Sequence, residues 1–127
     1  MRDSLDSHIK VMVIHHLTTF REAVAELISQ DPGLIVVGQG ATTEDALSII
    51  ERFHPEILLL DMDIPEDMRS FAHQLIIIHP EIKIIEMTYS ETGKADLPID
   101  VPEIYAHIRN DTTVLDLTEM IHKIAQT

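Results

Sequence analysis

Residues 55–65, Pro-Glu-Ile-Leu-Leu-Leu-Asp-Met-Asp-Ile-Pro, indicate the fold more clearly than any other part of the sequence. Four consecutive aliphatic residues, 57–60, stand between a proline and an aspartate. A short apolar run without alternation is typical of a strand that is buried on both faces, as in a parallel sheet covered by helices. The run therefore predicts a central parallel strand, with Asp61 at its carboxyl end.

Similar apolar runs alternate with segments of helical period along the whole chain. This alternation predicts an α/β domain with a parallel sheet. We expect five strands, at residues 9–14, 34–37, 57–60, 82–87 and 103–108. Residues 89–102 contain one glycine and two prolines without an apolar stripe, so we expect a loop or a single helical turn there.

Four helices are expected between and after these strands. The first has an apolar stripe from Phe20 to Ile28, and Thr42 opens the second through a capping box, with Phe53 facing the sheet. The third covers residues 66–79, with Ile78 among its inward positions, and Thr113 caps the last helix.

Composition limits the classes of function. The 127 residues fit one domain, 1–127, with a polar tail at 1–7. Cysteine is absent, and neither a secretory signal nor a membrane span is evident, so we expect a cytoplasmic protein. The net charge of -13, without a basic cluster, argues against nucleic acid as a partner.

Polar side chains follow the predicted strands at the sheet edge where open parallel sheets bind ligands. His15 and His16 follow the first strand, Asp61 and Asp63 the third, and Thr88 the fourth. Ile108 and Arg109 stand at the end of the fifth.

Nearly the whole chain resembles the receiver domains of bacterial response regulators, most closely those that precede helix-turn-helix transcription factors. The motif at 55–65 is the most specific match, and further matches are Ile9–Ile14, Phe20-Arg21-Glu22, Val36-Val37-Gly38, His79-Pro80 and Thr88. The resemblance implies a flavodoxin-like fold with strand order 2-1-3-4-5, here with a shortened or missing fourth helix. It also implies that Asp61 is the phosphoacceptor, that Thr88 completes the pocket and that Tyr105 is the switch aromatic.

Two residues that the family's phosphoryl transfer needs are replaced here. The family holds a divalent cation with an acidic pair after the first strand, where this chain has His15 and His16. Its lysine after the fifth strand corresponds to Ile108 or, with the register shifted by one, to Arg109. Because imidazole is a poor ligand for Mg²⁺, we expect Mg²⁺ binding to be weak or lost, with no other cofactor, unless Asp63 reaches a cation.

These observations favour a degenerate receiver that is not an enzyme and signals through protein contacts with a histidine kinase or a downstream regulator. A working receiver phosphorylated on Asp61 is the alternative, and a homodimer is compatible with either. A metal enzyme or sensor using His15, His16, Asp61 and Asp63 is a third hypothesis. We expect no metal site, because neighbouring strand residues point to opposite sides of a sheet.

Overall fold

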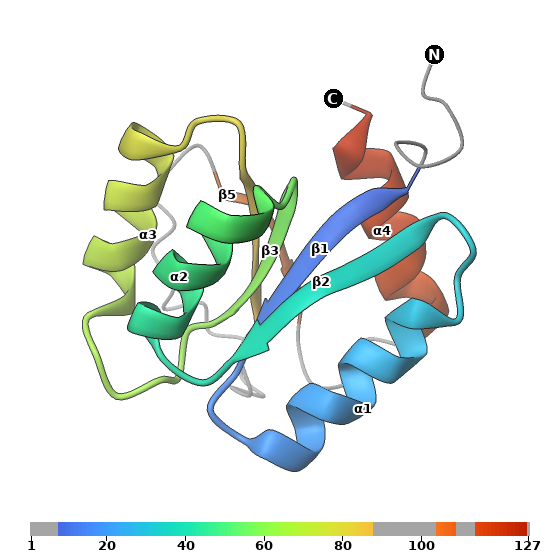
Figure 1. Cartoon of the computed structure of the whole chain (residues 1–127), viewed down its shortest axis with the longest axis horizontal. Coiled ribbons are helices and arrows are strands. Elements are labelled where there is room, and N and C mark those ends of the chain that lie inside the picture. Colours follow the sequence, from blue (N-terminus) through green and yellow to red (C-terminus); the bar gives the residue numbers. More distant parts are fainter. Residues whose placement is uncertain (1–7, 88–103, 109–113, 127) are drawn as a thin grey trace.

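A computed structural model describes residues 8–87, 104–108 and 114–126 of the chain. Strands and helices alternate along residues 9–87, and a further strand and helix follow among the described residues (Figure 1). The elements are β1 (Ile9–Ile14), α1 (Thr18–Ser29), β2 (Leu34–Gly40), α2 (Thr43–Phe53), β3 (Ile57–Asp61), α3 (Met68–Ile78), β4 (Lys83–Met87), β5 (Ile104–Ile108) and α4 (Val114–Ala125). The predictions for the tail at 1–7, for the segment 89–102 and for the Thr113 cap lie outside the described residues.

The strands form one parallel sheet in the order β2-β1-β3-β4-β5. β3, the strand of the motif at 55–65, lies at the centre of the sheet between β1 and β4. The predicted parallel α/β architecture is therefore confirmed. All strands point the same way, so the carboxyl ends of β1 and β3 lie side by side at one edge.

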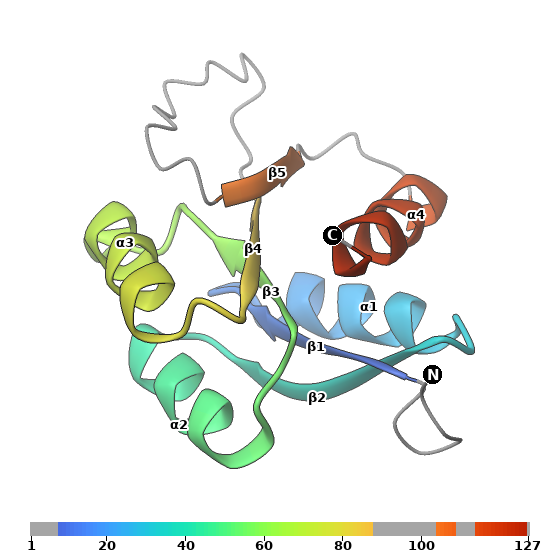
Figure 2. The ribbon, with the colours of Figure 1, turned by 90° about the horizontal axis from the view of Figure 1, so that it is seen from above.

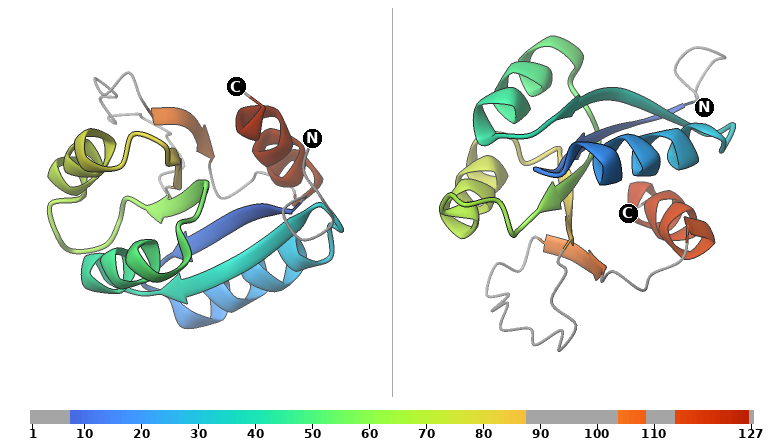
Figure 3. Two further views of the ribbon diagram at one scale, coloured as in Figure 1. Left: turned by 45° about the horizontal axis from the view of Figure 1, so that its top comes forward. Right: turned by 90° about the horizontal axis from the view of Figure 1, so that it is seen from below.

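Helices cover both faces of the sheet (Figures 2 and 3). Ile57 and Leu59 pack on the side of α1 and α4, whereas Leu58 and Leu60 pack on the side of α2 and α3. All four side chains are fully buried. The aliphatic run does not alternate with polar residues because both of its faces are buried.

The start of α2 agrees with the predicted capping box. The Thr42 hydroxyl accepts a hydrogen bond from the Asp45 N–H at 3.1 Å, and the Asp45 carboxylate accepts one from the Ala41 N–H at 2.9 Å. The bond from Ala41 lowers the pKa of Asp45, because it stabilises the charged carboxylate. α3 begins later than predicted, at Met68, because Asp67 caps it by accepting the Ser70 N–H at 3.1 Å.

Some apolar side chains of the predicted inward stripes are exposed, among them Leu27 at 37% and the two large side chains at the ends of α2 and α3. Phe53 is 41% exposed and Ile78 is 65% exposed. Each is the last residue of its helix, where the chain turns away from the sheet. The stripe along α3 is completed instead by Met68, Ala72 and Leu75, which are buried.

β2 extends three residues beyond its predicted end at 37. Gly38 lies in this extension, and a Cβ at that position would come within 2.6 Å of the Ile49 side chain on α2. The glycine therefore lets α2 pack closely on the strand. Glycine has a low strand propensity, which is why the sequence pattern ended this strand too early.

Candidate functional site

The site lies at the carboxyl ends of β1 and β3. Asp61 is the last residue of β3 and is fully buried. His15 and His16 follow β1 directly, and β1 pairs with β3 up to Ile14 opposite Leu60. His15 is buried, whereas the His16 side chain is 34% exposed. The sheet topology therefore brings together residues 45 positions apart in the sequence.

The Asp61 carboxylate accepts three hydrogen bonds. Its Oδ2 accepts the His16 backbone N–H at 3.1 Å and lies 2.5 Å from the Nδ1 of the same histidine. Its Oδ1 accepts the Asp63 N–H at 2.8 Å. A carboxylate can only accept, so the His16 ring donates from Nδ1. Both carboxylate oxygens are thus engaged by the chain itself.

His15 has a different role from its neighbour. Its Nδ1 accepts the Leu17 N–H at 3.1 Å and lies 3.7 Å from Asp61 Oδ2, too far for a hydrogen bond. Burial lowers the pKa of His15, and this outweighs the nearby charge of Asp61, which acts in the opposite direction. The lowered pKa favours the neutral ring, and Nδ1 carries no proton in this arrangement because it accepts the Leu17 N–H.

The two histidine rings face the same side of the sheet edge, contrary to our expectation. Their planes are 5° apart, with centroids at 5.4 Å, and the Phe20 ring lies 4.5 Å from that of His15 on a tilted plane. Alternation applies only within a strand, and β1 ends at Ile14. The chain bends at His16, so the two side chains do not point to opposite sides as neighbouring residues of a strand would.

Arg21 supports this loop, a contact that the sequence alone did not predict. Its Nη1 donates to the His15 carbonyl at 2.9 Å. Its charge also acts on His15, where it favours the neutral ring. The signals in the sequence were its place in the matching segment Phe20-Arg21-Glu22 and its position one helical turn into α1.

Four other residues were predicted to line the pocket, and the structure describes two of them. The Asp63 side chain is exposed, and the residue contributes its backbone N–H to Asp61. Met87 of β4 pairs with Asp61 on one side and with Ile108 on the other. The backbone of Ile108 is therefore in register with that of Asp61, the phosphoacceptor candidate. Thr88 and Arg109 lie outside the described residues.

Tyr105, the switch aromatic candidate, lies at an irregularity of β5. Ile84 pairs with Ile104, but Ile85 pairs with Ala106, so Tyr105 is the extra residue on its strand. An extra residue of this kind is a β-bulge, which often occurs near functional sites. Its assignment as a switch residue stays a prediction.

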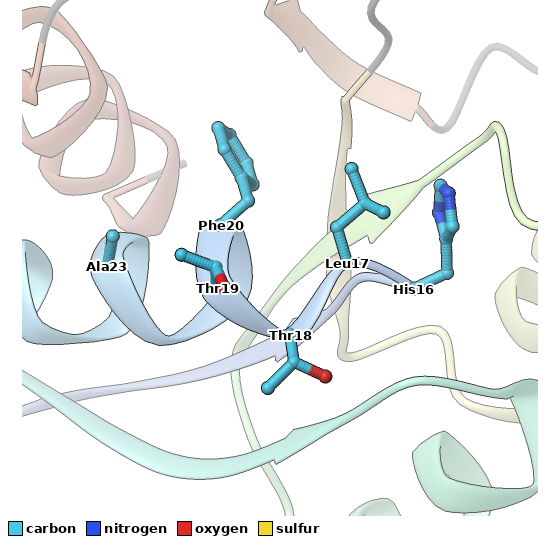
Figure 4. A pocket seen from close by; sticks show the side chains of 6 residues that line it. All are labelled: His16, Leu17, Thr18, Thr19, Phe20 and Ala23. Atoms are coloured by element: carbon cyan, nitrogen blue, oxygen red, sulfur yellow. The ribbon is translucent and has the colours of Figure 1, made fainter.

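A groove of about 600 Å³ opens beside the histidines at the start of α1 (Figure 4). Leu17 projects there and is 45% exposed. The lining residues are His16, Leu17, Thr18, Thr19, Phe20 and Ala23. The groove is thus mainly apolar, with the His16 ring at one end.

His15 offers a direct test through pH. Its folded-state pKa is lowered, so its contribution to stability is complete above its ordinary pKa of 6.5 and is lost as pH falls toward the folded value. The loss is at most about 1.4 kcal/mol per pH unit for one proton. We expect His15→Asn, whose amide oxygen can accept the Leu17 N–H, to lose less stability than the wild type below 6.5. Urea unfolding at a series of pH values measures the free energy of unfolding. The same dependence of this free energy on pH in both proteins would contradict the prediction.

No family model matches the chain. A protein-glutamate methylesterase/protein-glutamine glutaminase of Hydrogenovibrio crunogenus is 30% identical over 101 residues, covering 79% of this chain and 27% of that protein. The transcriptional regulatory protein DegU of Brevibacillus brevis is 25% identical over 84 residues, covering 65% of this chain and 36% of DegU.

Solved structures share the fold. The receiver domain of the response regulator NarL from Mycobacterium tuberculosis superposes with a TM-score of 0.84 at 19% identity, over 94% of this chain and 98% of that one. A CheY-like receiver domain protein from Methanospirillum hungatei gives 0.82 at 18% identity, over 94% and 95%.

The chain therefore has the fold of these response-regulator receiver domains, and its sequence is similar to segments of the two curated proteins. It spans about a third or less of the length of these two curated relatives. No helix among the described residues is long and apolar enough to span a membrane.

Proposed function

We propose that this receiver domain acts in two-component signalling by protein contact, without Mg²⁺-dependent phosphorylation of Asp61. The observation that carries the proposal is the closed state of the Asp61 carboxylate. The His16 N–H and ring occupy Oδ2, and the Asp63 N–H occupies Oδ1. In this arrangement His16 takes the place that a cation would need.

Phosphoryl transfer to a carboxylate requires a free oxygen and a cation that offsets the repulsion between two anions. Asp61 has no exposed surface, and the third group beside it is the neutral His15. The donor set is two imidazoles and one carboxylate, which does not fit an ion that prefers oxygen ligands and octahedral geometry. We therefore infer that Mg²⁺ binding here is weak or lost.

The groove beside His16 supports contact with a protein partner. Leu17 is exposed there, and Ala23 extends the apolar surface along α1. A histidine kinase or a downstream regulator is the partner class that the receiver fold suggests. The net charge of -13 disfavours nucleic acid, and a homodimer is compatible with this role. A cytoplasmic location and the absence of enzymatic activity are part of the same proposal.

The test is incubation with acetyl phosphate, with and without Mg²⁺, followed by intact mass measurement. We expect no phosphoryl adduct under either condition, because Asp61 is closed and lacks a cation. An adduct that forms with Mg²⁺ and disappears in Asp61→Asn would refute the proposal and establish the alternative, a working receiver. Glu119→Gln serves as the control, since it removes an exposed carboxylate on α4 and keeps Asp61 and Asp63.

A further inference from the structure

His15, His16 and Asp61 form a cluster suited to a metal ion that prefers nitrogen and oxygen ligands. Each offers one ligand atom, and these atoms lie within 4.8 Å of one another. We propose that the cluster binds Zn²⁺, or a similar transition-metal ion, instead of Mg²⁺. The inference deepens the proposed function and rests on it for the exclusion of Mg²⁺.

The distances are close to those of a zinc site. Bonds of 2.0–2.1 Å in a tetrahedron place neighbouring ligand atoms roughly 3.3 Å apart. Asp61 Oδ2 lies 2.5 Å from His16 Nδ1 and 3.7 Å from His15 Nδ1, so the observed separations lie on either side of that value. Widening the first separation by about 0.8 Å and narrowing the second by about 0.4 Å would match it.

The surroundings already hold the ligands in place. The carboxylate stays bonded to the backbone N–H groups of His16 and Asp63 when the His16 ring turns away. The His15 ring stacks with that of His16 and contacts that of Phe20, and Arg21 donates a hydrogen bond to the His15 carbonyl. Groups of this kind orient metal ligands in proteins and raise the affinity.

Binding has a defined proton balance. The His16 Nδ1 proton that is donated to Asp61 leaves to solvent, and the nitrogen lone pair then bonds the metal. His15 gives up its hydrogen bond with the Leu17 N–H, and because Nδ1 is the acceptor of that bond it has no proton to release. Because His16 lines the groove, a water or a partner side chain entering there can supply a fourth ligand.

Calorimetric titration of the whole chain with Zn²⁺, and separately with Mg²⁺, tests the inference. We expect saturable one-to-one binding of Zn²⁺ and none of Mg²⁺. His16→Gln and Asp61→Asn should each weaken Zn²⁺ binding about tenfold or more. His122→Gln is the matched control, because His122 also lies beside an aspartate, 3.1 Å from Asp31, on another part of the surface. Far-ultraviolet circular dichroism verifies that every variant is folded.

The result that would overturn the inference is the absence of saturable Zn²⁺ binding, or equal affinity in the wild type, His16→Gln and Asp61→Asn. Loss of binding in His122→Gln alone would also overturn it. Zinc binding at the cluster together with Mg²⁺-dependent phosphorylation of Asp61 would refute the proposed function and leave the zinc site standing. If the protein neither binds Zn²⁺ nor becomes phosphorylated, the zinc inference is overturned and the proposed function stands.

Discussion

A variant carrying both His15→Asp and His16→Asp is expected to bind Mg²⁺ roughly a hundredfold or more tightly than the wild type. The two new carboxylates would lie beside Asp61 and replace its closure by the His16 ring. Each attracts a divalent ion a few ångströms away with an energy on the order of several kcal/mol. Without Mg²⁺ the same charges repel one another, so we expect the variant to be less stable than the wild type and to recover on addition of the ion.

Thermal unfolding at increasing Mg²⁺ concentrations measures both effects. The control is a variant with His54→Asp and His73→Asp, which makes the same change in charge at two exposed positions. We expect its melting temperature to respond to Mg²⁺ no more than that of the wild type. Equal responses of the two double variants would mean that the histidines do not determine which ion the pocket accepts.

Replacing Glu86 is expected to have the largest stabilising effect. Glu86 lies in β4 opposite Leu60, on the face of α2 and α3, and is 3% exposed. Its Oε1 has no hydrogen-bond partner within the described structure. A buried polar atom without a partner costs about 1–3 kcal/mol, and we expect Glu86→Leu to recover a similar amount in urea unfolding at neutral pH.

The pH dependence of this effect has a definite sign. Burial raises the pKa of Glu86, against the opposing charge of Arg69. The neutral acid is favoured in the folded state, so its contribution to stability is complete below the ordinary pKa of 4.5 and is lost as pH rises through the folded value. Glutamine mimics the neutral acid. We therefore expect the gain in the free energy of unfolding from Glu86→Gln to grow as pH rises from 4.5 through the folded-state pKa of Glu86. A gain that is independent of pH would show that Glu86 does not titrate there.

The fold could be predicted from the sequence because its signals are local. The uninterrupted aliphatic run at 57–60 requires two covered faces, and the Thr42 cap marks the start of α2. The ends of elements were harder to predict. Ile78 fits the helical period, but it lies at the end of α3, where the sheet no longer covers it.

The location of the site could be predicted from the sequence, but the orientation of its side chains could not. Strand ends predicted that His15, His16 and Asp61 would lie at one edge, which the contacts among them confirm. The directions of the two rings depend on where β1 ends and on the bend that follows, which the sequence does not specify. The burial of Glu86 depends on its partner strand, so nothing in its own neighbourhood marked it.

Closure of the Asp61 carboxylate by His16, in the place of a cation, can be observed by nitrogen-15 NMR of the histidine rings in the metal-free protein at neutral pH. We expect Nδ1 of His16 to be protonated and Nδ1 of His15 to be unprotonated, because one donates to Asp61 and the other accepts from Leu17. An unprotonated Nδ1 in His16, unchanged in Asp61→Asn, would contradict this closure.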